Sequence, residues 1–98
     1  MHARIVSLPV RPGSLDEGAA IYRDSIIPAA MAQQGCKGAL LLADDATGRA
    51  LSITLWETQE NLLAGESSDY LQAQIAKFAT LATGSPTTEH FEVPCWEF

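Results

Sequence analysis

The sequence is poor in basic residues and has no long apolar run. Lysine and arginine together number 6 against 12 acidic residues, which gives a formal net charge of -6 at pH 7. A surface of that sign repels the phosphates of nucleic acids and of anionic membranes, so we expect neither as a partner. No apolar run approaches the roughly 20 residues of a membrane-spanning helix. Residues 1–11 also lack the apolar core of a signal peptide, so we expect a cytoplasmic protein.

Cysteine is scarce, and the spacings that mark common cofactor sites are missing. Cys36 and Cys95 are the only cysteines, too few for a disulfide framework, and we expect both to be buried thiols. The sequence has neither a Cys-x-x-Cys nor a His-x-x-x-His spacing, so we predict no metal site. The glycines do not have the spacing of a phosphate-binding loop, so no nucleotide cofactor is expected either.

What remains is the composition of one globular domain, which we expect to span residues 1–98. The hydrophobic fraction is 47%, enough for a core in a chain of this length. Hydrophobic periodicity predicts four strands, at residues 3–9, 37–43, 49–56 and 87–96. It also predicts three helices, at residues 14–34, 58–65 and 69–82. Pro28 is expected to kink or restart the first helix, because proline lacks a backbone N–H.

The order of these elements is β-α-β-β-α-β, which is typical of the α+β, ferredoxin-like split β-α-β fold. Right-handed crossovers then predict a four-stranded antiparallel sheet in the order 4-1-3-2, with helices on one face. Trp56 alternates with Leu51, Ile53 and Leu55, and we expect its ring on the face without helices. Because that face would be apolar and uncovered, we expect a homodimer in which two sheets pack face to face.

Three segments resemble a known family. Gly35-Cys36-Lys37-Gly38, the run from Thr47 to Thr58 that contains Leu-Trp-Glu-Thr, and the helix that begins near Ser67 resemble the antibiotic biosynthesis monooxygenase-like family. The resemblance implies a dimeric α+β barrel. The family holds monooxygenases that work without metal or flavin, haem-degrading enzymes and many proteins without an assigned activity. The haem-degrading branch has an asparagine in the first strand and a histidine in the last helix. Residues 3–8 contain no asparagine and residues 69–82 no histidine, so the resemblance implies no haem and no other cofactor.

Three residues are candidates for the site, and each has an alternative structural explanation. Trp56, the family tryptophan, could form a stacking wall for a planar substrate or an aromatic anchor in the core. His90 could act as an acid or base near neutral pH, or as a hydrogen-bonded structural residue. Tyr22, on the sheet-facing side of the first helix, could reach a substrate pocket with its hydroxyl or merely pack.

Two functions therefore stay open. The first is a cofactor-independent monooxygenase that acts on a small aromatic or quinol-like compound, with Trp56 and His90 as catalytic residues and Tyr22 and Trp56 in the binding site. The alternative is a non-catalytic dimeric protein of the same fold that binds a small apolar or aromatic ligand or has an accessory role. Fold does not decide between them.

Overall fold

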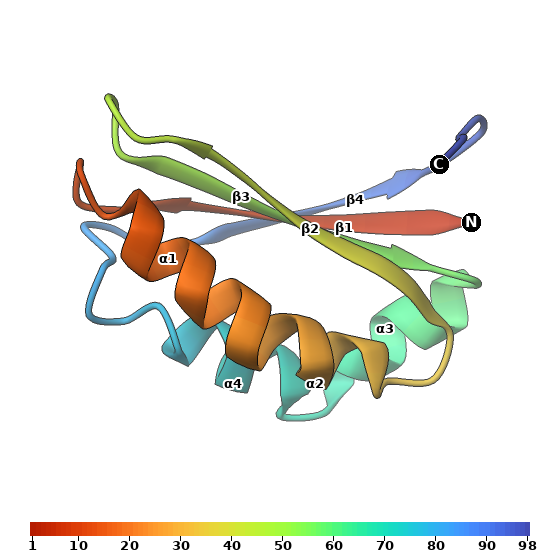
Figure 1. Ribbon diagram of the computed structural model, residues 1–98. Helices are drawn as coiled ribbons and strands as arrows, with labels where there is room; N and C mark the ends of the chain where they lie inside the picture. The colour runs from red at the N-terminus through yellow and green to blue at the C-terminus, as the bar shows by residue number, and fades with distance from the viewer.

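A computed structural model describes all residues 1–98 and contains a four-stranded sheet with helices on one face (Figure 1). The expected element order is confirmed. The elements are β1 (His2–Pro9), α1 (Leu15–Ile21), a π-helical turn (Tyr22–Ile26), α2 (Ile27–Met31), β2 (Cys36–Asp44), β3 (Arg49–Trp56), α3 (Gln59–Ser67), α4 (Tyr70–Ala76) and β4 (Thr87–Glu92).

The strands lie in the order β2-β3-β1-β4, and every neighbouring pair is antiparallel, as predicted. At the middle of the sheet Ile5 of β1 is opposite Ile53 of β3, which in turn is opposite Leu40 of β2. All the helices lie against the same face (Figure 1). No helix combines the length and the apolar character that crossing a membrane requires.

The first helical segment changes its geometry where proline enters it. Pro28 lies in the first turn of α2, so the expected restart is confirmed. The preceding turn is π-helical: Ile27 N–H bonds to the carbonyl of Tyr22, five residues earlier. The chain therefore absorbs proline's missing donor by widening one turn, and α1 and α2 continue along one path beneath the sheet (Figure 1).

The expected orientation of Trp56 is wrong. Its ring is completely buried and packs with Ala30 and Leu62, from α2 and α3, on the face that the helices cover. Side chains alternate along β3 as expected, but the Trp56 side faces the helices and the leucine and isoleucine side faces away from them. The sequence does not reveal this, because both faces of the strand carry side chains that can be buried. Leu51 and Ile53 therefore point away from the helices.

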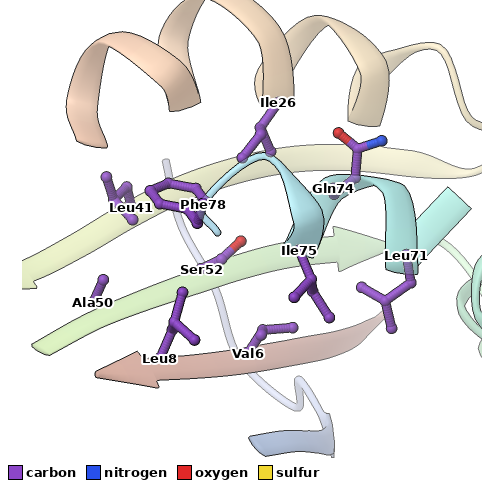
Figure 2. A pocket seen from close by; sticks show the side chains of 10 residues that line it. All are labelled: Val6, Leu8, Ile26, Leu41, Ala50, Ser52, Leu71, Gln74, Ile75 and Phe78. Atoms are coloured by element: carbon purple, nitrogen blue, oxygen red, sulfur yellow. The ribbon is translucent and has the colours of Figure 1, made fainter. Parts of the chain in front are cut away.

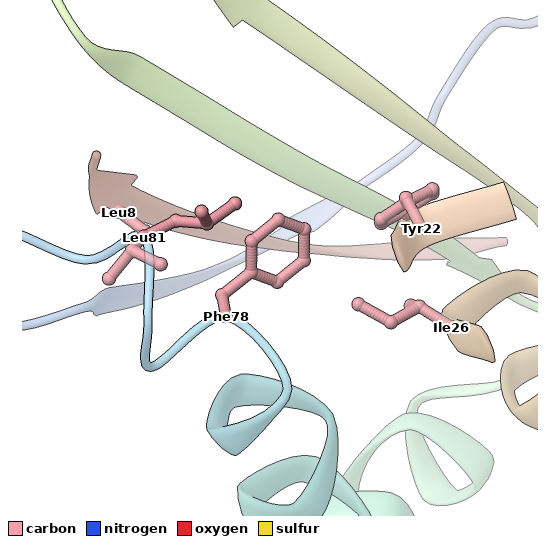
Figure 3. Packing of buried hydrophobic residues seen from close by; sticks show 5 residues of the cluster. All are labelled: Leu8, Tyr22, Ile26, Phe78 and Leu81. Carbon is pink, nitrogen blue, oxygen red and sulfur yellow. The ribbon is translucent and has the colours of Figure 1, made fainter. Parts of the chain in front are cut away.

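The main core forms between the sheet and the helices. It contains Leu8, Tyr22, Ile26, Phe78 and Leu81 (Figure 3). The helix α4 ends at Ala76, earlier than the predicted position 82, and the chain continues in turns. For that reason the fully buried residue of this segment is Leu81, whereas a continuous helical spacing would have buried Ala82.

The face without helices, here called the outer face, is largely apolar. It is formed by Ile5, Leu40, Leu42, Leu51, Ile53 and Phe91, by smaller side chains and by the charged residues Asp44, Arg49 and Glu89. Leu40, Leu42 and Phe91 are 37%, 44% and 48% exposed. An apolar surface of this kind on one side of a sheet is the feature that the sequence predicted, although with a different set of side chains.

The last strand is shorter than predicted. β4 ends at Glu92, and after it Val93 N–H still bonds to the carbonyl of Met1. Pro94 cannot donate the next backbone hydrogen bond, which explains why the ladder stops here. Cys95 then lies in an extended, exposed segment, so the prediction that it is a buried thiol is wrong, whereas Cys36 is buried as expected.

Candidate functional site

A small cleft lies between the sheet and α4, on the face that the helices cover (Figure 2). Its cavity volume is about 50 Å³. The lining comes from β1, the π-turn, β2, β3, α4 and the turn after it. It consists of Val6, Leu8, Ile26, Leu41, Ala50, Ser52, Leu71, Gln74, Ile75 and Phe78. Ser52 and Gln74 are its only polar members, so the cleft is built to hold an apolar molecule that carries few polar groups.

The polar side of the cleft is connected to Tyr22. The Tyr22 hydroxyl lies 3.0 Å from Ser52 Oγ and donates to the carbonyl oxygen of Leu40 at 3.0 Å. Burial raises the pKa of Tyr22, and the hydrogen bond with Ser52 opposes this in part. Tyr22 itself is absent from the lining. Its hydroxyl lies between the helix and the sheet, where it holds the Ser52 hydroxyl that the cleft presents.

The other polar group, Gln74, belongs to a chain of hydrogen bonds that connects α4 to the π-turn between α1 and α2. Lys77 Nζ donates to Gln74 Oε1 at 2.8 Å and to the carbonyl oxygen of Ser25, in the π-turn, at 3.3 Å. Gln74 Nε2 donates in turn to the carbonyl oxygen of Tyr70 at 3.3 Å. This chain of hydrogen bonds holds the helix that forms the roof of the cleft.

Beside the cleft, a second group of side chains surrounds a buried arginine; we call Arg4, Trp56, Glu66 and His90 the arginine cluster. Arg4 is 1% exposed, and its Nη1 donates to the carbonyl oxygen of Leu62 at 3.1 Å and to Glu66 Oε2 at 3.3 Å. Its Cζ lies 5.0 Å from the centroid of the Trp56 ring, a cation–π distance. Arg4 and Val6 are successive residues on one face of β1, so the cluster adjoins the cleft.

A hydrogen bond and an aromatic contact fix the position of the Trp56 ring. Its Nε1 donates to Thr54 Oγ1 at 2.9 Å. The edge of its ring meets the Tyr70 ring, with centroids 6.4 Å apart and planes at 79°. Because Tyr70 is the first residue of α4, the helix that roofs the cleft also covers the tryptophan.

His90 lies on β4, at the edge of the sheet. Its Nε2 is 2.6 Å from Glu66 Oε2, the same oxygen that Arg4 approaches, and its side chain is 41% exposed. The candidates Trp56 and His90 are therefore brought into one cluster, at opposite sides of Arg4 and Glu66, while Tyr22 lies with the cleft. Neither Trp56 nor His90 lines the cleft.

Sequence reasoning missed Arg4, Glu66, Ser52 and Gln74. Arg4 had a visible signal, because a cation in the middle of an apolar strand, in phase with Val6 and Leu8, requires a buried partner. Glu66 had no such signal, because its position beside Arg4 depends on where α3 ends. No three side chains of histidine, cysteine, aspartate or glutamate lie together in a way that could hold a metal ion.

Comparison with solved structures places this arrangement among known folds. No family model matches the sequence. A protein of unknown function from Nitrosomonas europaea superposes with a TM-score of 0.76 and 21% identity, over 99% of this chain and 92% of that one. A proposed antibiotic biosynthesis monooxygenase from Bordetella bronchiseptica superposes with a TM-score of 0.72 and 24% identity, over 96% and 97%. The chain has the antibiotic biosynthesis monooxygenase fold.

The chain also has sequence relatives that are longer than itself. It is 30% identical over 93 residues to the uncharacterized protein Rv2557 of Mycobacterium tuberculosis, covering 95% of this chain and 41% of that protein. It is 31% identical over 93 residues to Rv2558 of the same organism, covering 39% of that protein. The chain thus spans about two fifths of the length of the curated relatives it matches.

Replacing Trp56 by alanine is expected to destabilise this fold strongly, because it empties a site with no exposed surface and removes the cation–π partner of Arg4. We expect a loss of about 3 to 5 kcal/mol in the free energy of unfolding, measured by urea denaturation. Trp96, which is 53% exposed, provides the matched control, and Trp96→Ala is expected to lose less than about 1 kcal/mol. Equal losses in the two variants would contradict the buried position of Trp56.

Alkaline pH is expected to destabilise the protein through Tyr70. Burial raises the pKa of Tyr70 from 10.0 to about 12. Because the folded-state pKa is the higher one, this stabilisation is complete below pH 10 and is lost as the pH rises towards 12. Denaturation at intervals from pH 8 to 11.5 is expected to show a shallower decline for Tyr70→Phe than for the unaltered chain. Identical slopes would show that Tyr70 is not buried.

Proposed function

We propose that this protein binds a small, uncharged aromatic or quinol-like compound in the cleft beneath α4 and oxygenates it with O2, without a bound cofactor. The observation that supports this is the lining: apolar side chains on both sheet and helix, and one hydroxyl and one amide as the polar groups. Such a site holds a flat ring by apolar contact and orients it by one or two hydrogen bonds.

The cleft must open for such a ligand. A volume of about 50 Å³ is well below the roughly 150 Å³ of an apolar cavity that holds benzene. The element that we expect to move is α4. It has only seven residues, and Lys77, the residue after it, bonds to the π-turn. Because α4 carries Tyr70, its movement would also uncover the edge of Trp56, which would then become a wall of the enlarged site.

The reaction needs no external reductant when the substrate carries two removable hydrogens. Written for a substrate RH2, it is RH2 + O2 → R=O + H2O, so one oxygen atom enters the product and the other leaves as water with both hydrogens. The substrate is oxidised and dioxygen reduced, with no net release of protons. We assign the orientation of the substrate to two groups: Ser52 Oγ, which donates to Tyr22 and can accept from a substrate hydroxyl, and Gln74 Nε2, whose second N–H can donate to a substrate oxygen. His90 and Glu66 would form the polar end of the opened site, beyond Arg4.

Ligand binding without turnover is the second candidate, and one observation favours it. The lining contains no carboxylate, imidazole, amine or guanidinium, so no group with a pKa near neutrality touches a bound molecule. Catalysis would then depend on His90 reaching the ligand after α4 moves, or on the reactivity of the substrate alone. Solution measurements with one substrate distinguish the two functions.

Oxygen uptake with anthrone tests the proposal. We expect the unaltered chain, assayed with a metal chelator present, to convert anthrone to anthraquinone with one atom of labelled oxygen from 18O2. Ile75→Trp fills the cleft from α4 and should lower kcat/KM by tenfold or more, about 1.4 kcal/mol. Leu63→Trp, at an exposed position of α3, is the control and should keep the activity.

The same assay tests the two catalytic candidates. Trp56→Phe keeps most of the ring volume, and His90→Gln keeps a donor towards Glu66. If both variants retain full turnover, neither residue is catalytic. Binding of anthrone that Ile75→Trp abolishes, with no oxygen uptake in any variant, would establish the second candidate and reject the oxygenase.

The proposal includes a homodimer formed through the outer face. Its support is the row of apolar side chains that no element of the chain covers, and sheets that pack face to face are a standard solution for such a surface. A two-fold axis would place each outer face against its own copy. The cleft and the arginine cluster lie on the opposite side of the sheet, so dimer formation would leave them open.

Ile53→Glu is expected to abolish the dimer, because it places a carboxylate at the centre of the outer face. Sedimentation velocity at micromolar concentration should give a dimer for the unaltered chain and a monomer for this variant. Met31→Glu, which changes an exposed side chain on the helical side, should remain dimeric. An unaltered chain that sediments as a monomer would contradict the homodimer and leave the cleft proposal intact.

A further inference from the structure

Three charged side chains on the outer face form no ion pair within the chain. They are Arg49 at the start of β3, Asp44, which is opposite Arg49 on β2, and Glu89 on β4, and all three are exposed. The other arginines each lie near a carboxylate: Arg4 by Glu66, Arg11 by Glu17 and Arg23 by Asp24. Arg49 is thus the one arginine that this acidic chain leaves unpaired.

Arg49 also lies in a groove suited to a carboxylate. The groove has a volume of about 360 Å³, and no carboxylate contributes to its lining. Four hydroxyl side chains line the groove together with Arg49: Ser7, Thr47, Ser85 and Thr87. A cation with several hydroxyl donors beside it matches the charge and the four lone-pair sites of an ionised carboxylate.

Glu89 lies on the same face as Arg49, at a position from which a two-fold axis can bring it to Arg49 of a second copy. In the register, Arg49 is opposite Pro9 and Glu89 is opposite Ile5, so they are four residues apart along β1 and two strands apart across the sheet. The diagonal between them is roughly 17 Å and passes near the middle of the face. In an isologous interface, an axis that bisects this diagonal brings each Arg49 against the partner's Glu89, twice per dimer.

An unpaired carboxylate cannot be buried without a large penalty. Packing two outer faces together would desolvate Glu89, whose neighbours on β1 and β3 are Ile5 and Ile53. Its own chain offers no cation on this face except Arg49, which lies across the diagonal. We infer that, in the homodimer proposed above, Glu89 of each copy enters the groove of the other and pairs with Arg49. This inference rests on that homodimer and specifies its orientation.

Charge reversal tests the pairing. Arg49→Glu and Glu89→Arg, each alone, should weaken the dimer by tenfold or more in Kd, because each places two like charges together. The double variant R49E/E89R restores opposite charges, and its Kd should return to within about threefold of the unaltered chain. The readout is sedimentation velocity or fluorescence-detected dissociation across a dilution series. Circular dichroism and melting temperature are recorded to verify folding.

Matched controls separate pairing from net charge. Arg23→Glu and Glu17→Arg make the same charge changes on α1 and the π-turn, away from the sheet, and should leave Kd nearly unchanged. Should a reversed variant fail to fold, Arg49→Gln and Glu89→Gln replace it, and each should weaken the dimer less strongly.

The outcomes are distinct. Recovery in the double variant supports the inference. A dimer that single reversals do not weaken, or that the double variant does not restore, overturns the pairing and leaves the homodimer standing. A monomeric unaltered chain overturns both. If added inorganic phosphate binds the groove and the dimer is indifferent to Glu89, the groove is an anion site and the pairing is rejected.

Discussion

The guanidinium of Arg4 determines how one end of the molecule is assembled. A buried cation is tolerated only when its hydrogen bonds and its charge are both met, and here the partners come from different parts of the chain. Helix α3 supplies the Leu62 carbonyl and the Glu66 carboxylate, and the last residue of β3 supplies the face of the indole. His90 then joins β4 to the same carboxylate. The ion pair of Arg4 and Glu66 thus fixes α3, the two central strands and the edge strand β4 to one another.

The same group connects this end to the cleft. The residue that covers Trp56 is Tyr70, and it begins the helix whose next turns roof the cleft. Any displacement of α4 therefore changes the surroundings of Trp56 and, through it, of Arg4. A ligand that opens the cleft would therefore change the surroundings of the edge strand β4, although His90 of that strand does not line the cleft.

Much of the fold could be predicted from the sequence, because alternating and helical spacings are local properties. They gave the order of elements, the order of strands and one uncovered apolar face. The inverted faces of β3 show the limit. Ser52 and Thr54 lie on the same side of β3 as Trp56, and their hydroxyls bond to Tyr22 and Trp56 on the face that the helices cover. The identity of those partners is a tertiary property, and it decides which face is the inner one.

The candidate site was less accessible for the same reason. Its lining comes from six parts of the chain, and no short motif contains more than a few of them. Tyr22 could be assigned to the space between helix and sheet from helical spacing alone. The role of Gln74 depends on where α4 ends and on the hydrogen bond from Lys77 to the π-turn. Neither follows from the spacing of apolar residues in the sequence.

The π-turn at Tyr22–Ile26 has a consequence for how this chain tolerates changes in length. One extra residue is accommodated in that turn. An α-helix advances by about 100° per residue, so one residue added to a regular helix would rotate everything after it by that angle. The widened turn takes up such a residue locally, so deleting one residue there would restore a regular helix and leave Ala30, which has no exposed surface and lies against Trp56, facing the indole. The widened turn therefore acts as an angular spacer, which absorbs a one-residue difference in length before that difference reaches the core.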